Sequence, residues 1–463
     1  MHMIHLFDLP HQEFSVKFNK KHLDTLREII KKRFHNIRKF IPSIQDCSSF
    51  KNNMAGSLEA RVYKILTNNS YIPLDFLIKL SQLLNIDSKE IEKHVVLLAN
   101  NRYAKKPISI SFPFVIDNEF ARICEIIRTE GYLSKDLQIT LSNSDMRIIN
   151  KFIDSFKIFS LKKEDFYFRL YTKIAIPNYV KKEDIHIYDV TKRRKIKNFS
   201  VRIKLLKEGK KKEIHIYDPN LGASKKKYRV IIPTRTIICT VDFSEDNPIH
   251  SYSSYIGGKG KNITSSLCVT LSSNVIGKLM HYVGEIPLGR KSHKIRLPKF
   301  ILEGNRSLIG ATFEEAINCD GHIEKYQIKL KSISKEYLED WKKTLNEKFG
   351  IKSTIRKYDL VITHKENFKK MANNFVFLPE KNEKLKNMAS GKIVLHPRTA
   401  LQHYRSLIEQ SGPLKVTELA HMTGKTTSCI KKIMKELFEK DRVDRERIDS
   451  RGTYLYMGKH LNE

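Results

Sequence analysis

Two carboxylates hold matching places in two similar stretches of this 463-residue chain. Glu130 precedes Gly131 after an apolar run that starts at Phe120, and Asp320 precedes Gly321 after a second apolar run. A carboxylate in the last turn of a helix opposes the helix dipole, at a cost of about 0.3–1 kcal/mol, so two of them suggest another requirement. Two carboxylates brought together can bind a divalent cation that activates water. The alternative is a pair of solvated acids inherited through duplication, and the spacing alone does not decide between the two.

Each carboxylate is expected where a helix meets a strand. In the second stretch, apolar residues at helical spacing predict a helix that ends at Asp320, and residues 326–330 alternate as in a strand. Gly321 is expected to take the left-handed conformation that ends a helix. The first stretch repeats this order, with a helix from Phe120 and a strand at 137–141. A duplicated unit of this kind usually forms a pseudo-symmetric pair whose matched helices face each other.

The two stretches also resemble the motifs of a known family. Aligned on the final glycine, residues 123–131 read ICEIIRTEG and residues 313–321 read FEEAINCDG. They resemble the LAGLIDADG homing endonucleases, in the single-chain form with two repeats. Residues 284–291, GEIPLGRK, and the later Pro298 are similar to the GxPxGxK segment and proline that precede the second motif in archaeal members. The resemblance implies an α+β fold with two pseudo-symmetric αββαββα repeats.

The resemblance also implies roles for particular residues. Glu130 and Asp320 would bind Mg²⁺ above the minor groove of double-stranded DNA. Lys291 or Lys294 would stabilise charge on the cleaved phosphate. Saddle-shaped sheets would read the major groove. Further DNA contacts are expected from residues in and around these segments, namely Arg290, Arg296, Gln138 and Gln327.

The third motif position departs from the family pattern. It usually holds Gly or Ala, which lets the two helices approach closely, but Glu125 and Glu315 stand there in this chain. Two carboxylates at a close helix contact are costly unless each is paired or turned to solvent. We therefore expect these helices either to pair the carboxylates, to expose them, or to cross differently.

The composition favours a polyanion as the partner. The chain has 85 Lys+Arg against 51 Asp+Glu, a formal net charge of +34. It has no apolar run of about 20 residues and no lipidation signal, which favours nucleic acid over a membrane. The first residues lack the pattern of a signal peptide, so a cytoplasmic, nucleoid-associated location is expected. None of the six cysteines forms a C-x-x-C pair, which argues against a zinc site.

The chain is expected to divide into six segments. These are a helical, helix-turn-helix-like domain at 1–104, the first repeat at 105–175, a basic β-rich segment at 176–262, the second repeat at 263–380, a linker at 381–396 and a winged helix-turn-helix domain at 397–463. Helical patterns in the first segment end with one from Ser88 to Leu98. A small helical bundle without DNA contacts is the alternative for this segment.

Residues 176–262 allow two interpretations. The sequence IHIYD occurs at 185–189 and again at 214–218, and each copy lies near a basic cluster. These strands either extend the DNA-facing sheet of the first repeat, with Lys and Arg on phosphates, or form a separate insertion. A helical stretch from Ser265 to Met280 is then expected to lead into the second repeat.

The C-terminal segment has the pattern of three helices and a β-hairpin, the order found in a winged helix-turn-helix. Its expected core is Val416, Leu419, Ala420, Ile430, Ile433, Met434 and Leu437. DNA contacts are expected from the outer face of the last helix and from the hairpin, namely Lys425, Thr426, Thr427, Ser428, Lys431, Lys432, Lys435 and Arg451. A winged helix used for protein contacts is the alternative.

These observations predict a DNA-binding protein of the LAGLIDADG type. The leading hypothesis is a Mg²⁺-dependent endonuclease that cuts both strands at a specific site, as a monomer with internal pseudo-two-fold symmetry. One alternative is a transcription regulator of the same descent that binds without cutting, which Glu125, Glu315 and the added domains favour. Another is an RNA-binding or RNA-processing factor, because positive charge does not distinguish DNA from RNA.

Overall fold

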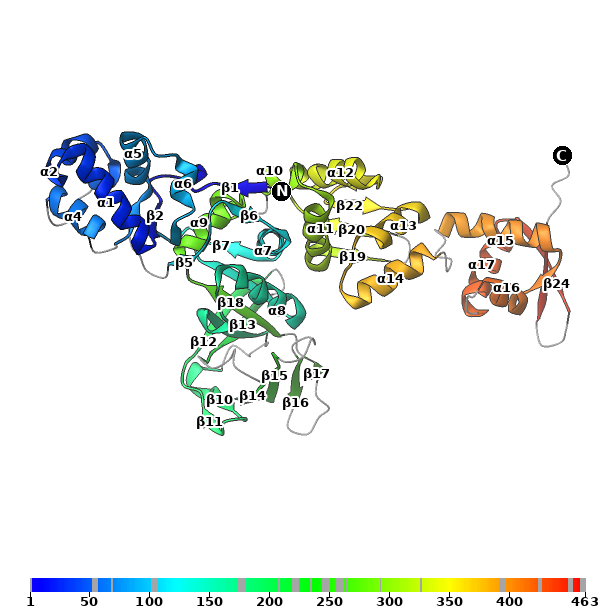
Figure 1. Cartoon of the computed structure of the whole chain (residues 1–463). Helices are drawn as coiled ribbons and strands as arrows, with labels where there is room; N and C mark the ends of the chain where they lie inside the picture. Colours follow the sequence, from blue (N-terminus) through cyan, green and yellow to red (C-terminus); the bar gives the residue numbers. More distant parts are fainter. Residues whose placement is uncertain are drawn as a thin grey trace. The chain divides into compact units, whose positions relative to one another are not determined.

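The computed structural model describes most of the chain and divides it into two compact units. The described residues are 2–51, 57–67, 70–100, 107–173, 180–206, 209–218, 225–233, 235–243, 250–254, 261–262, 265–291, 293–324, 327–390, 397–423, 427–448 and 453–458. One unit comprises Met1–Asp320 with Ser332–Asp340, and the other comprises Gly321–Lys331 with Trp341–Glu463. Helices and sheets both contribute (Figure 1), which confirms the predicted mixed α+β class. Within the described residues no helix is long and apolar enough to cross a membrane.

The N-terminal region combines helices with a small sheet. Its helices are α1 (Lys20–Phe34), α2 (Ile37–Phe40), α3 (Ser48–Lys51), α4 (Leu58–Thr67), α5 (Leu74–Leu84) and α6 (Ser88–Glu92). Its sheet has the order β3-β2-β4-β5, with β2 (Phe14–Phe18), β3 (Ile72–Pro73), β4 (Val95–Asn100) and β5 (Ile108–Ser109). The helix predicted to run to Leu98 is therefore wrong beyond Glu92. Val95 starts a strand that pairs with β2, and a short apolar run fits a buried strand as well as a helix.

The first repeat has the element order αββαββα. Its elements are α7 (Asn118–Thr129), β7 (Gly131–Leu133), β8 (Ile139–Asn143), α8 (Met146–Ser155), β9 (Phe166–Lys173), β18 (Ser265–Leu271) and α9 (Asn274–Tyr282). The helix predicted from Ser265 is wrong over the first seven positions, because β18 inserts there between β8 and β9. Helix α9 follows, and the side-chain oxygen of Ser273 caps its first turn by accepting from Ile276 N.

The second repeat has the same element order. Its elements are α11 (Arg306–Asp320), β19 (Gly321–Ile323), β20 (Ile328–Lys331), α12 (Lys335–Phe349), β21 (Ser353–Arg356), β22 (Asp359–Ile362) and α13 (Lys365–Asn374). Its sheet order β19-β20-β22-β21 matches the order β7-β8-β18-β9 of the first repeat, strand for strand. The linker predicted from residue 381 is wrong up to residue 389. Those residues belong to α14 (Pro379–Ala389), which buries Leu385 and Met388.

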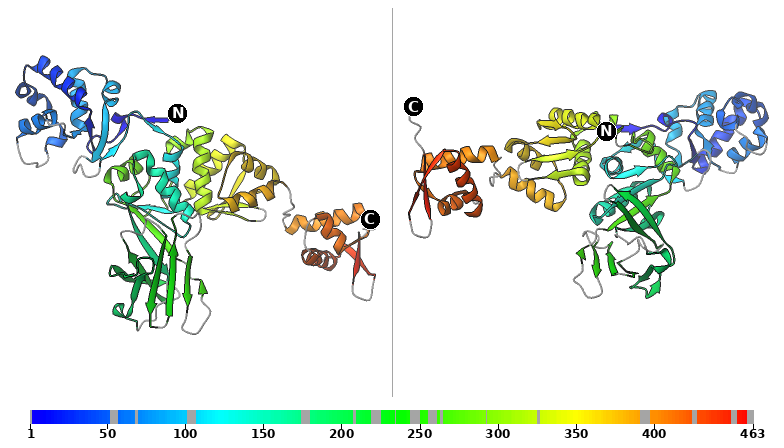
Figure 2. Two further views of the ribbon diagram at one scale, coloured as in Figure 1. Left: turned by 60° about the horizontal axis from the view of Figure 1, so that its bottom comes forward. Right: turned by 180° about the vertical axis from the view of Figure 1, so that it is seen from behind.

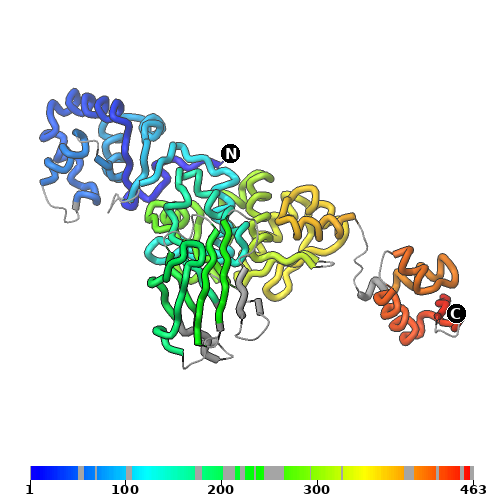
Figure 3. Tube along the Cα trace, turned by 90° about the horizontal axis from the view of Figure 1, so that it is seen from below, coloured from blue at the N-terminus to red at the C-terminus, as the bar shows by residue number. Residues whose placement is uncertain are grey.

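The β-rich segment lies between β9 and β18 and contributes to two sheets. Its strands are β10 (His186–Asp189), β11 (Arg194–Lys195), β12 (Phe199–Leu206), β13 (Gly209–Tyr217), β14 (Lys226–Ile232), β15 (Arg235–Val241), β16 (His250–Ser254) and β17 (Lys261–Asn262). Strands β12 and β13 extend the sheet of the first repeat, in the order β12-β13-β9-β18-β8-β7. The others form a second sheet with the order β11-β10-β14-β15-β16-β17. Figure 3 shows strands of the β-rich segment, in green, side by side.

The C-terminal region has a core of its own. Its elements are α15 (Pro397–Ser411), β23 (Leu414–Lys415), α16 (Val416–Thr423), α17 (Thr427–Glu439), β24 (Val443–Arg447) and β25 (Tyr454–Gly458). The core cluster is Tyr404, Ile408, Leu419, Ala420, Ile430, Met434, Leu437, Val443 and Tyr456, with Val416 and Ile433 packed against it. All seven residues predicted from the sequence therefore belong to this core or contact it.

Candidate functional site

Helices α7 and α11 pack against each other (Figure 2). At their first turns, Asn118 Nδ2 donates to Ser307 Oγ at 3.0 Å. Glu130 caps the other end of α7, and Asp320 is the last residue of α11. Glu130 and Asp320 therefore each stand at the C-terminal end of one of two helices that pack against each other.

Lys291 lies at the C-terminal end of α7. Its ammonium donates to the carbonyl oxygens of Ile127, of Arg128 at 2.6 Å and of Thr129 at 3.1 Å. A lysine has three N–H donors, so these last carbonyls of α7 can engage all of them. A cation at the C-terminus of a helix also complements its dipole.

The electrostatic environment of Lys291 includes both motif carboxylates. Burial, together with the positive charge of Arg128, lowers the pKa of Lys291 to about 8. Asp320 and Glu130 act in the opposite direction, because a neighbouring negative charge favours the charged ammonium. One lysine nitrogen thus interacts with both carboxylates.

The segment 284–291 reaches this position through two glycines. A Cβ on Gly284 would lie 2.6 Å from Met280 O and 2.8 Å from Cys124 Sγ, so only glycine allows this approach to α7. Gly289 has a φ of +75°, a conformation that favours glycine, and its N–H donates to Leu133 O at 2.8 Å. These contacts explain why both glycines of the GEIPLGRK segment are needed to deliver Lys291.

Neither motif glycine has a positive φ, and Gly131 is required by close packing. Gly131 starts β7 directly after Glu130, and a Cβ on it would lie 2.7 Å from Ile127 Cα. Gly321 similarly starts β19 after Asp320. The prediction that Gly321 takes a left-handed conformation is wrong, since the positive-φ glycines of the described chain are Gly289, Gly350 and Gly412.

Glu125 is buried and paired. Arg128 Nη1 lies 2.6 Å from Glu125 Oε2, and the side chains of both residues are fully buried. The hydroxyl of Tyr337 donates to the other carboxylate oxygen. Arg128 Nη2 also donates to Gly284 O at 2.8 Å, which ties the ion pair to the segment that carries Lys291.

Glu315 is buried and paired with different partners. Lys151 of α8 forms an ion pair with it, and Arg122 Nε lies 3.6 Å from its Oε1. Burial raises the pKa of Glu315, and the positive charges of Lys151 and Arg122 oppose that rise. Of the outcomes expected for the third motif position, pairing in the interior applies to both repeats.

The other residues predicted to contact DNA are dispersed. Lys294, Arg290 and Gln138 are exposed. Arg296 forms a two-point ion pair with Asp340, at 2.8 and 3.2 Å, and Gln327 donates to Glu324. On α17 the exposed positions are Thr427, Ser428, Lys431, Lys432 and Lys435. Lys425, Thr426 and Arg451 lie outside the described residues.

The sheet of order β12-β13-β9-β18-β8-β7 has an apolar face and a polar face. One face buries Leu170, Ile214 and Ile216 completely. The residues that alternate with these along each strand point to the other face. On that face the Arg169 guanidinium lies 5.4 Å from the Tyr217 ring centroid. The alternation in residues 166–172, FYFRLYT, was the available signal for this face.

The chemistry of the two helix ends fits a hard divalent cation. Mg²⁺ is usually bound by one or two carboxylates, with water and substrate phosphate oxygens completing the shell. Glu130 and Asp320 supply two carboxylates at adjacent helix ends. In the described part of the chain, no cluster of three or more His, Cys, Asp or Glu side chains offers a fuller ligand set.

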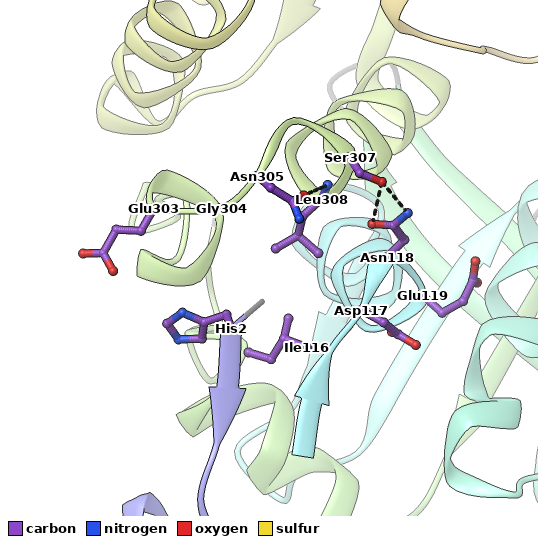
Figure 4. Close-up of a pocket in the computed structure, with 10 residues that line it drawn as sticks. All are labelled: His2, Ile116, Asp117, Asn118, Glu119, Glu303, Gly304, Asn305, Ser307 and Leu308. Carbon is purple, nitrogen blue, oxygen red and sulfur yellow. Dashed lines mark hydrogen bonds between the residues drawn. The ribbon is translucent and has the colours of Figure 1, made fainter. Parts of the chain in front are cut away.

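A cavity of about 530 Å³ opens at the opposite end of the helix pair (Figure 4). Its lining includes Asp117, Glu119 and Glu303. Asp117 caps α7 by accepting from Phe120 N at 2.8 Å, and Glu119 pairs with Arg122. These acids therefore have structural partners at the start of α7, remote from Glu130 and Asp320.

Comparison with known proteins supports the LAGLIDADG family for the second motif region. Residues 309–375 match the LAGLIDADG-like domain, a family with DNA-binding and nuclease members. Over 108 residues the chain is 34% identical to the replication factor C small subunit of Methanocaldococcus jannaschii. That match covers 21% of this chain and only 6% of the length of the relative.

Proposed function

We propose that this chain, whose residues 309–375 match a LAGLIDADG-like domain, is a Mg²⁺-dependent endonuclease that cuts both strands of a specific DNA site. One observation carries the proposal. Glu130 and Asp320 end two helices that pack against each other, and the part-buried ammonium of Lys291 donates to the last carbonyl oxygens of α7 beside Glu130. A pair of carboxylates held this way, within a strongly basic chain, suits a phosphodiester substrate with its accompanying cation.

In this proposal the two carboxylates hold the metal ion. Mg²⁺, when bound, would polarise the phosphate and lower the pKa of a bound water. Lys291 fixes the last turn of α7 through its three carbonyl contacts, and so fixes the backbone that carries Glu130. Lys294 is exposed on the same segment, where it can contact the phosphate and offset its charge.

Binding of the duplex is assigned to several surfaces. The polar face of the sheet that contains β9 and β13, with Arg169 and Tyr217, would contact base edges. The C-terminal region, which we interpret as a winged helix-turn-helix, would present Lys431, Lys432 and Lys435 to phosphates. The N-terminal region, interpreted as helix-turn-helix-like through α5 and α6, would add affinity. We propose that the chain acts as a monomer with internal pseudo-two-fold symmetry.

A second candidate function is a transcription regulator that binds DNA without cutting it. The observation that favours it is the placement of Lys291, which already supplies a positive charge beside both carboxylates. The three carbonyl contacts of its ammonium leave it no further N–H for a phosphate. In a regulator this internal cation would replace the metal ion permanently.

One experiment separates these functions. The full chain is incubated with a library of random duplexes, with Mg²⁺ or with EDTA, beside a Glu130→Gln/Asp320→Asn variant. An endonuclease cuts both strands of a selected duplex only as wild type with Mg²⁺. A regulator retains the same duplex uncut, equally in both proteins.

A charge-matched control keeps the comparison clean. Glu303→Gln/Glu339→Gln removes two exposed carboxylates away from the motif helix ends and should cut like wild type. Loss of cutting in this control would mean that net charge, rather than the paired carboxylates, governs the activity. Enrichment of RNA in place of duplex DNA in a parallel library would overturn both candidate functions.

A further inference from the structure

We propose that the two repeats read half-sites of unequal length, and that the first repeat contacts additional base pairs at the end of the target remote from the cleaved bonds. This inference rests on the proposed function, since it assigns duplex DNA as the partner of the sheets. It concerns the hairpin of β12 and β13, which lies outside both motif regions.

Each of the two sheets contains four equivalent strands in the same order, and the sheet of the first repeat has two more. Strand β7 follows Glu130 directly, as β19 follows Asp320, so these strands mark the end of each sheet next to the motif carboxylates. In the first repeat the order β7-β8-β18-β9 continues into β13 and β12 at the opposite edge. The second repeat stops at β21, the equivalent of β9. The extension is therefore one-sided and lies far from Glu130 along the sheet.

The added length corresponds to a few base pairs. Neighbouring strands lie about 4.8 Å apart, so two strands widen the sheet by about 10 Å. Bases along one strand of a duplex are about 3.4 Å apart, so this width matches about three base pairs. The half-site of the first repeat should exceed that of the second by this amount.

Polar groups on this face continue onto the added strands. Thr140 and Thr270 place their hydroxyl oxygens 3.4 Å apart across β8 and β18. Further along, Arg169 of β9 lies over the ring of Tyr217 on β13. The Tyr217 hydroxyl is then 3.3 Å from Ser200 Oγ on β12. Hydroxyl and guanidinium groups in such a row are the groups that bond base edges and phosphates.

The opposite face of the extension is apolar, which fixes its orientation. Ile214 and Ile216 of β13 are fully buried. Because successive strand residues point to opposite faces, Tyr217 must lie on the polar face. The backbone register also pairs Lys204 of β12 with Lys211 of β13 towards the tip of the hairpin.

The test uses the duplex selected from a random library by the full chain in EDTA, where no cutting occurs. Hydroxyl-radical footprinting on that duplex should show two protected arms, one longer by about three base pairs. Arms of equal length overturn the inference but leave the proposed function standing. If no duplex is enriched, the proposed function fails, and this inference fails with it.

A pair of matched tyrosines identifies the long arm. Tyr217→Ala removes a side chain from the extension, and Tyr132→Ala removes an exposed one from β7 on the same sheet. In repeated selections, Tyr217→Ala should lower base preference about five- to tenfold at the outermost positions of the long arm alone. Tyr132→Ala should act at positions near the centre.

Folding is checked by circular dichroism, and Ser200→Ala serves as the milder change on β12. A shortened protected arm in Ser200→Ala supports the inference even where Tyr217→Ala is unstable. Unchanged preference at the outermost positions in both folded variants overturns it.

Discussion

The third motif position of the first repeat differs from that of the second in how its carboxylate is neutralised. Glu125 is paired with Arg128 of its own helix, at 2.6 Å. It also accepts a hydrogen bond from the hydroxyl of Tyr337 on α12. Arg128 in turn donates to Gly284 O, so this network fixes the segment that delivers Lys291. In the first repeat, then, the buried charge secures the surroundings of the motif carboxylates.

In the second repeat the same position links α11 to α8 and to α7. Glu315 on α11 is paired by Lys151 of α8 and by Arg122 of α7. Arg122 Nη2 also lies 3.4 Å from Glu314 Oε2. Helices α7 and α11 thus each bury a glutamate, Glu125 or Glu315, but the two side chains have different partners. Substitutions at the two networks should accordingly have unequal effects on stability and activity.

The largest loss is expected for Arg128→Met. It leaves the fully buried Glu125 carboxylate without its cation, which typically costs about 3–5 kcal/mol. Hydrogen–deuterium exchange of peptides from α7 measures this local free energy of unfolding in a chain of two units. The double variant Glu125→Gln/Arg128→Met should recover most of the loss, because no unpaired charge remains. A single variant as stable as wild type would contradict the assignment of this ion pair.

A smaller loss is expected for Tyr337→Phe. The change removes only the hydroxyl that donates to Glu125, and a hydrogen bond to a charged group contributes about 1.5–3 kcal/mol. The same exchange measurement should show reduced protection of α7. In a Glu125→Gln background the loss should shrink, since the acceptor is then uncharged. Equal losses in both backgrounds would mean that Tyr337 acts through packing alone.

Local patterns in the sequence predicted much of the two repeats. The order of helix, acid, glycine and strand was visible at Glu130 and at Asp320, and both helix ends lie as expected. The seven predicted residues of the C-terminal core belong to it or contact it, because the apolar residues of α16 and α17 recur at helical spacing. Tyr404, Ile408, Val443 and Tyr456 also belong to this core and were not predicted. The two short runs that form β4 and β18 were wrongly predicted as helix, because period alone does not separate a buried strand from a short helix.

The partners of the buried glutamates could not be predicted in the same way. Tyr337 is 212 positions from Glu125, and only the packing of the folded chain brings them together. The glycines of the motifs were noticed, but the reason for Gly131 is the approach of Ile127 Cα, a tertiary distance. Likewise α14 was taken for a linker because of its polar composition, although Leu385 and Met388 recur at a helical spacing that buries one face.

The motif glycines offer a direct comparison of the two repeats. Gly131→Ala places a Cβ 2.7 Å from Ile127 Cα, and a backbone atom cannot move aside as a side chain can. Overpacking of this kind costs about 1–3 kcal/mol, and it should displace Glu130 and reduce cutting. Gly321→Ala should cost less, because Gly321 is half-buried whereas Gly131 is buried. Thermal unfolding of both variants, with cutting assays, checks the order, and a greater loss at Gly321 would reverse it.

The smallest expected effect, Lys151→Met, depends on pH. Burial raises the pKa of Glu315 above its ordinary value of 4.5, so the folded state favours the protonated form, and stability declines as pH rises through the folded pKa. Removing Lys151 raises this pKa further, since Arg122 at 3.6 Å is then the main remaining cation. The variant should match wild type near pH 4.5 and lose about 1–2 kcal/mol by pH 8, a value discounted because Lys151 is partly exposed.

Thermal unfolding across this pH range measures the effect, with Lys157→Met as the control. Lys157 is an exposed lysine paired with the exposed Asp154, so its loss should change stability little at any pH. In a Glu315→Gln background the pH dependence of Lys151→Met should disappear, because no carboxylate remains to ionise. A loss that is constant from pH 4.5 to 8 would instead assign the effect to packing of the lysine stem, and the two repeats would then differ less in electrostatics than their contacts indicate.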